Sequence, residues 1–390
     1  MDFAKTSVLI FGAAGRQALP VCRGFFELGC RVVCYCFNRW DEGYLTRYKT
    51  ERIVYDRAEA GGMDFYSYGM RLIRENRYSL VVPLNDKCAR YLSQHKAEID
   101  PGTKVAVNDW AVQEYASDKA KTMAVCAAHG IPAPKTICGE NLAGRLDEID
   151  FRYPVVVKPR TGIGSIGFNI LRSREKLERY LASYDAKNGP LLIQEYIRQG
   201  SHPQYRADLF RTKSGEFKAA TVGRVTRWYP LDGGSGIFVI SVHDDAILDS
   251  CRRLLDAVGW VGYANIDLIM DEETNTAKIL EINGRTGASI LIDYVCGINM
   301  SRLMLENALD LPVTDYTAYP DGKRISCFAA DLMWFLKSKD RFRAKPSWFS
   351  RIGVKDVIFS WNDPLPAVGF FVKSVRKFDQ SVDARRRFDE

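Results

Sequence analysis

The sequence NIDLIMD, residues 265–271, is followed by the loop EETNT and then by AKILEIN, residues 277–283. Both flanking stretches alternate polar and apolar residues with a period of two, which is typical of a half-buried β-strand. The loop between them is short enough for a β-hairpin. We therefore predict two antiparallel strands, each with one polar and one apolar face.

The register of this predicted hairpin brings two acidic side chains together. If Asp271 pairs with Ala277, then Asp267 pairs with Glu281, and Asn283 lies on the same face. The other, mostly apolar face then carries Ile266, Leu268, Met270, Lys278, Leu280 and Ile282. Two carboxylates directly opposite each other repel, and a divalent cation held by hard oxygen ligands removes the repulsion. The pattern predicts a magnesium site at Asp267, Glu281 and Asn283, with a solvated sheet face as the alternative.

Length and composition indicate a globular protein of two or three domains. The chain has 390 residues, of which 46% are hydrophobic. No run approaches the roughly 20 apolar residues that a membrane span needs. The apolar run at residues 6–12 precedes Arg16 and Gln17 and lacks a cleavage pattern, so it indicates a first strand and not a signal peptide. We expect a cytoplasmic protein with no membrane partner.

Cysteine, histidine and charge patterns argue against several kinds of site. The ten cysteines are scattered without a C-x-x-C pair, so we expect reduced thiols. The four histidines form no H-E-x-x-H motif, so zinc is not expected. The net charge of +7 is dispersed, and the basic run at residues 385–387 is interpreted as a solvated tail, so no nucleic-acid partner is expected. A phosphate-rich small ligand explains the positive excess equally well.

The N-terminal part predicts a parallel sheet with helices on both faces. Strands are expected at residues 7–12, 31–37, 79–85 and 104–108. The turn GAAG after the first strand suggests a dinucleotide site. However, the third glycine of that fingerprint is missing, and Asn38 and Arg39 stand where an acid would bind the ribose. We therefore favour a structural turn.

The middle of the chain alternates helices, strands and glycine-rich turns. Helices are expected at residues 117–130, 173–184 and 243–260, and strands at 153–159, 168–172, 191–197 and within 205–242. The turn RTGIGSIG, residues 160–167, has three glycines that allow backbone amides to cradle phosphate oxygens. Lys158 precedes this turn and a strand follows it, unlike in a P-loop. The alternative is a long hairpin turn without a ligand.

This ordered series of motifs resembles the ATP-grasp superfamily. The motifs are SDK at 117–119, YPVVVKPRTGIGSIG at 153–167, IQEYI at 193–197, and GYANIDLIM with ILEINGR within 262–285. Each alone is weak, but their order and spacing match. The resemblance covers residues 1–310. It implies a Rossmann-like parallel-sheet domain at 1–113, an ATP-grasp domain at 114–310 with a lid at 125–192, and a C-terminal extension at 311–390.

The resemblance also implies roles for individual residues. Contact with the nucleotide phosphates is implied for Lys119, Lys158, Gly162, Gly164, Ser165 and Gly167. Contact with adenine or ribose is implied for Glu195, Tyr196 and Ile197. Asp267, Glu281 and Asn283 are the implied ligands of one or two Mg²⁺ ions, for which Mn²⁺ can substitute. Contact with the reacting phosphate or the carboxylate substrate is implied for Arg285, Arg224 and Arg227.

The sequence departs from the family pattern at two points. Relatives often have an acid at the start of the strand after the hinge, where this chain has Gln204, and Asp208 is the nearby substitute. Relatives also often have proline before the arginine of the last motif, where this chain has Gly284.

The activity implied by the resemblance is ATP-dependent activation of a carboxylate as an acyl phosphate, followed by attack of an amine. Two alternatives stay open. One is phosphorylation of a small carboxylate, as in carbamoyl-phosphate synthetase, and the other is an ATP-binding module without turnover. The oligomeric state also stays open, a homodimer being one alternative.

Overall fold

The computed structural model describes residues 3–162, 167–198, 204–231 and 235–374. Contacts divide the chain into two compact units, each assembled from separate segments. Unit 1 consists of Met1–Val107, Arg285–Thr314 and Lys355–Glu390, and unit 2 consists of Asn108–Gly284 and Asp315–Val354. These units differ from the three consecutive parts expected from the sequence, because the chain returns to unit 1 twice.

Unit 1 contains a five-stranded parallel sheet, which confirms the predicted N-terminal fold class. The strand order is β3 (Glu51–Val54), β2 (Arg31–Cys36), β1 (Ser7–Phe11), β4 (Leu80–Pro83) and β5 (Lys104–Val105). Its helices are α1 (Ala18–Glu27), α2 (Glu42–Leu45), α3 (Phe65–Asn76), α4 (Asp86–Gln94), the short η1 (Lys96–Glu98), α9 (Leu291–Val295) and α10 (Met300–Ala308). Strand β3 was not predicted, because its sequence ERIV is short, begins with two charged residues and has no buried position.

The glycine turn after β1 binds a carboxylate of the protein itself. Gly12 and Gly15 have φ angles of 72° and 88°, which side chains with a Cβ rarely adopt. The backbone N–H of Gly15 donates to Glu42 at 2.6 Å. Lys373 contacts the same carboxylate at 2.6 Å and Asp41 at 3.5 Å. Glu42 thus lies where a phosphate would approach the turn, which supports the interpretation as a structural turn.

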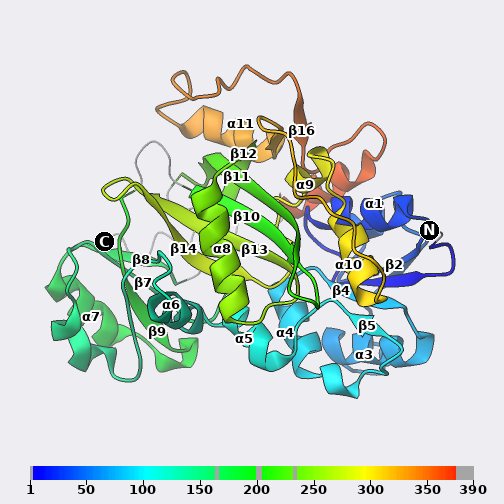
Figure 1. The fold of residues 1–390 in the computed structure, drawn as a ribbon, viewed down its shortest axis with the longest axis horizontal. Helices are drawn as coiled ribbons and strands as arrows, with labels where there is room; N and C mark the ends of the chain where they lie inside the picture. Colours follow the sequence, from blue (N-terminus) through cyan, green and yellow to red (C-terminus); the bar gives the residue numbers. More distant parts are fainter. Residues whose placement is uncertain (1–2, 163–166, 199–203, 232–234, 375–390) are drawn as a thin grey trace. The chain divides into compact units, whose positions relative to one another are not determined.

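The central sheet of unit 2 is antiparallel and curves behind a long helix (Figure 1). Its strand order is β14 (Thr276–Asn283), β13 (Gly262–Asp271), β10 (Gln204–Arg211), β11 (Phe217–Tyr229), β12 (Ser235–Val242), β15 (Arg324–Ser326) and β16 (Val354–Asp356). Helices α5 (Trp110–Ser117), α6 (Lys119–Ala128), α8 (Asp245–Ala257) and α11 (Phe328–Lys337) accompany it. Apolar residues of α6, α8 and the sheet, including Cys251, Leu254 and Ile266, form one buried core.

A second, smaller sheet of unit 2 has its own core. Its strands are ordered β6 (Thr136–Cys138), β9 (Leu191–Glu195), β7 (Val155–Pro159) and β8 (Asn169–Leu171). Helix α7 (Arg174–Ser183) and two short 3₁₀ segments, η2 (Leu142–Glu148) and η3 (Ala186–Asn188), complete it. Val155, Val157, Leu177 and Ile193 are fully buried in this core. The strands predicted at 153–159, 168–172 and 191–197 are all present, each slightly shorter than expected.

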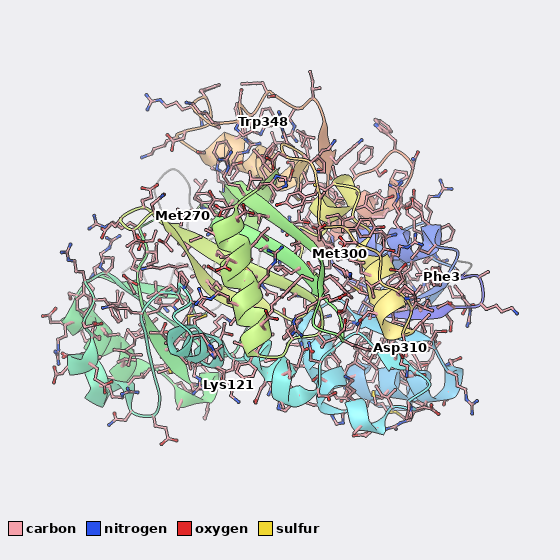
Figure 2. All side chains as sticks on the ribbon, in the orientation of Figure 1. Phe3, Lys121, Met270, Met300, Asp310 and Trp348 are labelled. Carbon is pink, nitrogen blue, oxygen red and sulfur yellow. The ribbon has the colours of Figure 1, made fainter. Side chains whose placement is uncertain are left out.

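The predicted hairpin β13–β14, with Met270 near its tip (Figure 2), exists with one change of register. Asp267 pairs with Glu281 and Asn265 with Asn283, as predicted. The register then shifts, so that Leu268 pairs with Ile279 and Asp271 with Thr276. The expected pairing of Asp271 with Ala277 was wrong, because a β-bulge at Leu280 adds one residue to β14.

Two further expectations concern cysteines and membrane spans. All ten cysteines are free thiols, and nine of them are buried. Among the described helices, none combines the length and the hydropathy needed to cross a bilayer.

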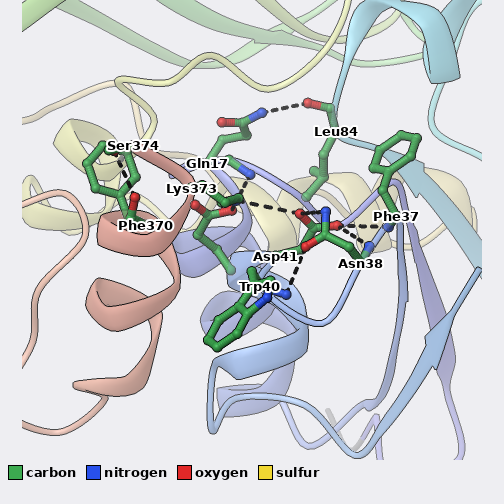
Figure 3. Close-up of polar contacts among 11 residues, drawn as sticks. Gln17, Phe37, Asn38, Trp40, Asp41, Leu84, Phe370, Lys373 and Ser374 are labelled. Atoms are coloured by element: carbon green, nitrogen blue, oxygen red, sulfur yellow. Dashed lines mark hydrogen bonds and ion pairs between the residues drawn. The ribbon is translucent and has the colours of Figure 1, made fainter. Parts of the chain in front are cut away.

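Unit 1 also contains a polar network around Asp41, which Figure 3 shows together with Lys373 of the C-terminal segment. Asp41 accepts hydrogen bonds from the backbone N–H groups of Phe37 and Asn38 at 2.8 and 3.1 Å. Asp363 of the C-terminal segment accepts hydrogen bonds from the Thr46 hydroxyl and from the backbone N–H of Arg47. The segment from Lys355 to Ser374 is therefore an integral part of unit 1.

Candidate functional site

One face of the central sheet of unit 2 carries a row of charged side chains. Asp267 on β13 lies between Glu281 on β14 and Arg206 on β10, because both are its direct cross-strand partners. Side chains of directly paired residues point to the same face of a sheet. The predicted carboxylate pair therefore forms, together with an arginine that was not predicted.

Each carboxylate of this pair has a cationic neighbour. Lys119 Nζ lies 3.0 Å from Glu281 Oε2, and Arg206 Nε lies 3.5 Å from Asp267 Oδ1. The repulsion inferred from the sequence is thus balanced by protein cations in the ligand-free protein. A bound divalent ion would compete with Lys119 for Glu281, and anionic phosphates would then offer Lys119 a new partner.

Lys119 and Lys158 converge on the carboxylate pair from two different elements. Lys119 is the first residue of α6, and its backbone N–H donates to the carbonyl of Arg160 at 3.0 Å. The Arg160 guanidinium in turn binds Asp118, the N-cap of α6, at 2.5 and 3.1 Å. These contacts join the start of α6 to the end of β7, the strand that carries Lys158.

The pKa of Lys158 is lowered to about 8. Burial is the main cause, because it disfavours the charged ammonium group, and the charge of Lys119 lowers it further. The negative charges of Glu281 and Asp267 act in the opposite direction. Lys158 therefore lies within electrostatic reach of both acids, and an anionic ligand would stabilise its charged form.

A buried hydrogen-bond network lies beside the carboxylate pair. Asp208 on β10 accepts hydrogen bonds from the Tyr263 hydroxyl and, at 2.8 Å, from the Asn265 amide. The Asn265 oxygen accepts from Asn283 Nδ2 at 3.2 Å, and the same nitrogen lies 3.3 Å from Asp267 Oδ2. Burial raises the pKa of Asp208 to about 6, although these hydrogen bonds oppose the rise. The network fixes which end of the Asn283 amide is the donor.

The predicted metal ligands form a donor set that suits a magnesium–phosphate complex. Within the described part of the chain, no group of three or more His, Cys, Asp or Glu side chains could hold a metal by itself. Asp267, Glu281 and the Asn283 amide supply two carboxylates and one neutral oxygen. Magnesium is usually bound by one or two carboxylates together with substrate phosphates and water, and this incomplete oxygen set fits that pattern.

The glycine-rich turn is described only at its ends. Lys119 Nζ donates to the carbonyl of Gly162 at 3.2 Å, which brings the start of the turn to the lysine. Gly162 and Gly167 have φ angles of 141° and 77°, so both use conformations that favour glycine. The predicted residues Gly164 and Ser165 lie outside the described residues.

The predicted hinge residues lie at the end of β9, of which Glu195 is the last residue, and directly after it. Glu195 Oε2 binds Lys278 at 3.0 Å and accepts the Lys135 backbone N–H at 3.2 Å. Lys278 also binds Asp271 at 2.9 Å. Glu195 thus joins the small sheet to β14, while Tyr196 is half-buried and Ile197 is buried. A role for these three residues at adenine stays a prediction.

The register does not bring Arg224 and Arg227 together with the carboxylate pair. Arg224 pairs with Tyr205, and Tyr205 belongs to the apolar core on the opposite face of the sheet. A bulge between Val225 and Arg227 leaves Arg227 beside Phe238 on that same face. The guanidinium of Arg227 is buried and binds Asp331 at 2.6 and 3.1 Å. The contacts of Arg227 are those of a structural ion pair.

Arg285 and Gly284 follow β14. Arg285 binds Asp86, the first residue of α4, at 3.3 Å within unit 1. A Cβ at Gly284 would lie 2.2 Å from the Gln113 amide nitrogen and 2.8 Å from Trp260. Gln113 donates to the Gly284 carbonyl at 3.1 Å. Close packing of the chain therefore explains why glycine stands where relatives often have proline.

Sequence reasoning missed Arg206 and underrated Asp208. The sequence does contain a pattern that includes both residues, because Gln204, Arg206 and Asp208 alternate with apolar residues in QYRADLF. That period of two predicts a polar strand face. What the sequence could not show is that this strand pairs with β13, which places Arg206 beside Asp267.

Comparison with known proteins identifies the fold of this region. A family model described as an ATP-grasp domain matches residues 116–289. This range includes α6, the small sheet and the hairpin β13–β14. The chain contains an ATP-grasp domain. This confirms the resemblance inferred from the sequence motifs and the expected fold class.

Two curated relatives are similar to part of this chain. D-aspartate ligase of Enterococcus faecium (strain Aus0004) is 25% identical over 260 residues, covering 61% of this chain and 62% of that protein. The N-terminal section of the carbamoyl phosphate synthase large chain of Methanopyrus kandleri is 23% identical over 209 residues, covering 49% of this chain and 36% of that protein. The chain thus spans less than two thirds of either relative.

Solved structures show the same fold at low identity. The biotin carboxylase domain of Hydrogenobacter thermophilus 2-oxoglutarate carboxylase, in complex with MgADP, ADP and bicarbonate, has a TM-score of 0.66 at 18% identity. The match covers 82% of this chain and 73% of the biotin carboxylase domain chain. L-amino acid ligase from Bacillus licheniformis has a TM-score of 0.59 at 18% identity, with 78% and 74% covered. At these identities the likeness shows the fold alone.

Proposed function

We propose that this ATP-grasp protein is an ATP- and Mg²⁺-dependent ligase that joins a carboxylate to an amine. The observation that carries the proposal is the convergence of Lys119 and Lys158 on the Asp267–Glu281 pair. Two cations beside two acids form a site that can hold a phosphate chain and its metal ion at once. The names of two relatives, D-aspartate ligase and L-amino acid ligase, support amino acids as the substrate class.

The proposed reaction has two steps. A carboxylate oxygen of the first substrate attacks the γ-phosphorus of ATP, the bond to the ADP oxygen breaks, and an acyl phosphate forms. The amine nitrogen of the second substrate then attacks the acyl carbon, inorganic phosphate leaves, and the nitrogen loses a proton. No covalent bond to a protein side chain is required.

The residues of the site contribute mainly charge and position. Lys119 and Lys158 would bind phosphate oxygens on which negative charge develops, and their fixed placement stabilises the transition state. Asp267, Glu281 and Asn283 would hold Mg²⁺, which supplies further positive charge at the transferred phosphate. Arg206 would keep Asp267 oriented through their contact. Arg227 is not part of this proposal, because its guanidinium is occupied by Asp331.

Release of ADP during incubation with pairs of amino acids, D-aspartate among them, tests the proposal. Glu281→Gln should lower the ADP-release rate at least about a hundredfold, because it removes one metal-binding charge while keeping the side-chain volume. Glu273→Gln, in the exposed turn of the same hairpin, is the matched control and should keep wild-type turnover. Near wild-type turnover of Glu281→Gln would overturn the assignment of the site.

The same experiment separates the remaining alternatives. ADP release that depends on bicarbonate alone, without an amino acid, would favour phosphorylation of a small carboxylate. Binding of ATP by calorimetry without ADP release under any substrate pair would favour a binding module that lacks turnover.

A further inference from the structure

The end of α11 and the segment that follows it expose large apolar side chains. Within residues 336–354 of unit 2, the exposed fractions are 59% for Leu336, 73% for Phe342, 64% for Phe349 and 94% for Ile352. Exposed apolar residues are common singly, but four within nineteen residues form a concentration that calls for a partner. We refer to residues 336–354 as the C-terminal patch.

The C-terminal patch is ordered by contacts beneath it. The ring of Phe335 lies 5.6 Å from the rings of Phe342 and Phe349 and 4.4 Å from that of Trp348, measured between centroids. Trp348, labelled in Figure 2, donates from its indole nitrogen to the Asp331 carbonyl at 3.1 Å. The buried Asp331 carboxylate also binds Arg351 at 2.5 Å. The exposed rings are therefore held in place by a buried anchor.

The same residues carry a concentrated positive charge. The C-terminal patch contains six Lys and Arg residues and a single acid, Asp340. Lys339, Arg343 and Lys345 are exposed and lie within six residues of an exposed ring, Phe342 or Phe349, along the chain. The whole protein has a net charge of only +7, so this one short segment carries most of its positive excess.

The combination of charge and apolar side chains decides which partner fits. A second copy of the chain bound across a twofold axis would place the positive segment against itself, and like charges repel. Single-stranded nucleic acid would match the charge and stack on Phe342 and Phe349, but Leu336 and Ile352 offer no ring for stacking. A bilayer with anionic headgroups satisfies both features, because apolar side chains enter its interface while Lys and Arg stay at the headgroups.

We propose that the C-terminal patch binds the surface of an anionic lipid bilayer. The exposed side chains of Phe342, Phe349 and Ile352 would enter the headgroup–acyl boundary, and Lys339, Arg343 and Lys345 would bind the headgroups. The expectation of no membrane partner rested on the absence of an apolar run long enough to span a bilayer. Binding at the surface requires no such run.

The test uses the full-length protein and sedimentation with lipid vesicles. The protein should sediment with vesicles of phosphatidylcholine and phosphatidylglycerol, less with phosphatidylcholine alone, and less as salt is added, because salt screens the headgroup charge. The triple variant Lys339→Gln, Arg343→Gln, Lys345→Gln should bind about a hundredfold more weakly, at about fivefold for each charge. The matched control removes three exposed charges elsewhere, with Arg57→Gln, Lys87→Gln and Lys187→Gln, and should bind like the wild type.

Apolar variants test the second half of the proposal. Ile352→Ser should weaken vesicle binding severalfold, and Ile352→Trp should strengthen it, because tryptophan favours the membrane interface. Ile352 is nearly fully exposed, so neither variant should change the thermal unfolding temperature. Because Ile352→Trp is expected to gain binding, loss of folding cannot mimic the predicted result.

Four outcomes would overturn the proposal. They are failure to sediment with anionic vesicles, equal binding to neutral vesicles, binding that none of these substitutions alters, and a stable dimer in analytical ultracentrifugation that Ile352→Ser dissociates. RNA binding with the same dependence on Ile352 and the three cations would assign the C-terminal patch to nucleic acid instead.

Discussion

At the scale of single residues, Asp208 is the one that sequence reasoning underrated most. A carboxylate only accepts hydrogen bonds, so the Asn265 amide must point its nitrogen to Asp208 and its oxygen to Asn283. Asn283 must therefore donate from its own nitrogen, so its oxygen is the atom of this amide that could bind a cation. Asp208 thus acts as a positioning residue for a proposed metal ligand that it does not touch.

Asp208→Asn should weaken metal binding by about tenfold, a typical effect of removing a residue that orients a metal ligand. The new amide can donate to Asn265, which reverses the order of donors along the network. Electron paramagnetic resonance of Mn²⁺, titrated in the presence of a non-hydrolysable ATP analogue, measures this affinity directly. Asp249→Asn, on the exposed face of α8, is the control. A lower unfolding temperature with unchanged Mn²⁺ affinity would show that Asp208 serves only folding.

If Lys158 binds the nucleotide phosphates as proposed, it should make nucleotide binding depend on pH. Its pKa of about 8 in the free protein lies below that of an unfolded lysine, because burial disfavours the charge. Nucleotide phosphates would raise this pKa, so binding should take up protons near pH 8, and affinity should fall as the pH rises above that value. For the nucleotide-free protein, the contribution of Lys158 to stability should increase from about pH 8 to about pH 10.4, since the unfolded state binds more protons in this window.

Calorimetry of ATP-analogue binding in two buffers with different ionisation enthalpies measures this proton uptake. Lys158→Arg keeps its charge throughout the range, so it should bind without the uptake seen for the wild type. Absence of proton uptake by the wild-type protein at pH 8 would contradict the proposed contact between Lys158 and phosphate.

At the scale of elements, the periodicity of the sequence predicted most strands, but it did not predict the register in which they pair. The hairpin β13–β14 follows from its alternating residues, and the predicted pairing of Asp267 with Glu281 is present although the register assumed at Asp271 was wrong. The bulge at Leu280 could not be predicted, because a single extra residue leaves the alternation on each side intact. It allows Ile279 to face the core together with Leu268, while Glu281 keeps the opposite face.

The predicted roles of Arg224 and Arg227 show the same limit. Their positions in the chain matched those of cations in relatives, but the face on which a strand residue points depends on register and on bulges. Buried ion pairs such as Arg227 with Asp331 join residues 104 positions apart. Neither local periodicity nor motif spacing contains that information.

At the scale of the whole molecule, the C-terminal segment of the chain packs into unit 1 together with the N-terminal segment. Lys373 binds Glu42 at 2.6 Å and Asp41 at 3.5 Å, and both acids are almost completely buried. Glu42 also receives the N–H of Gly15 from the glycine turn after β1. A cation from the end of the chain therefore neutralises two acids near its beginning, which sequence spacing could not indicate.

Lys373→Met should lower the free energy of unfolding of unit 1 by about 3 kcal/mol, since removing one partner of a buried ion pair leaves an uncompensated charge. Burial raises the pKa of Asp41, and the charge of Lys373 opposes that rise. The variant should therefore recover part of its stability as the pH falls and Asp41 becomes protonated, because its folded-state pKa lies above the unfolded value. Urea unfolding at neutral and mildly acidic pH measures both effects.

Lys355→Met, an exposed position in the same segment, is the control. Adding Asp41→Asn to Lys373→Met should restore part of the lost stability. Equal stability of Lys373→Met and Lys355→Met at neutral pH would show that water already neutralises the two acids.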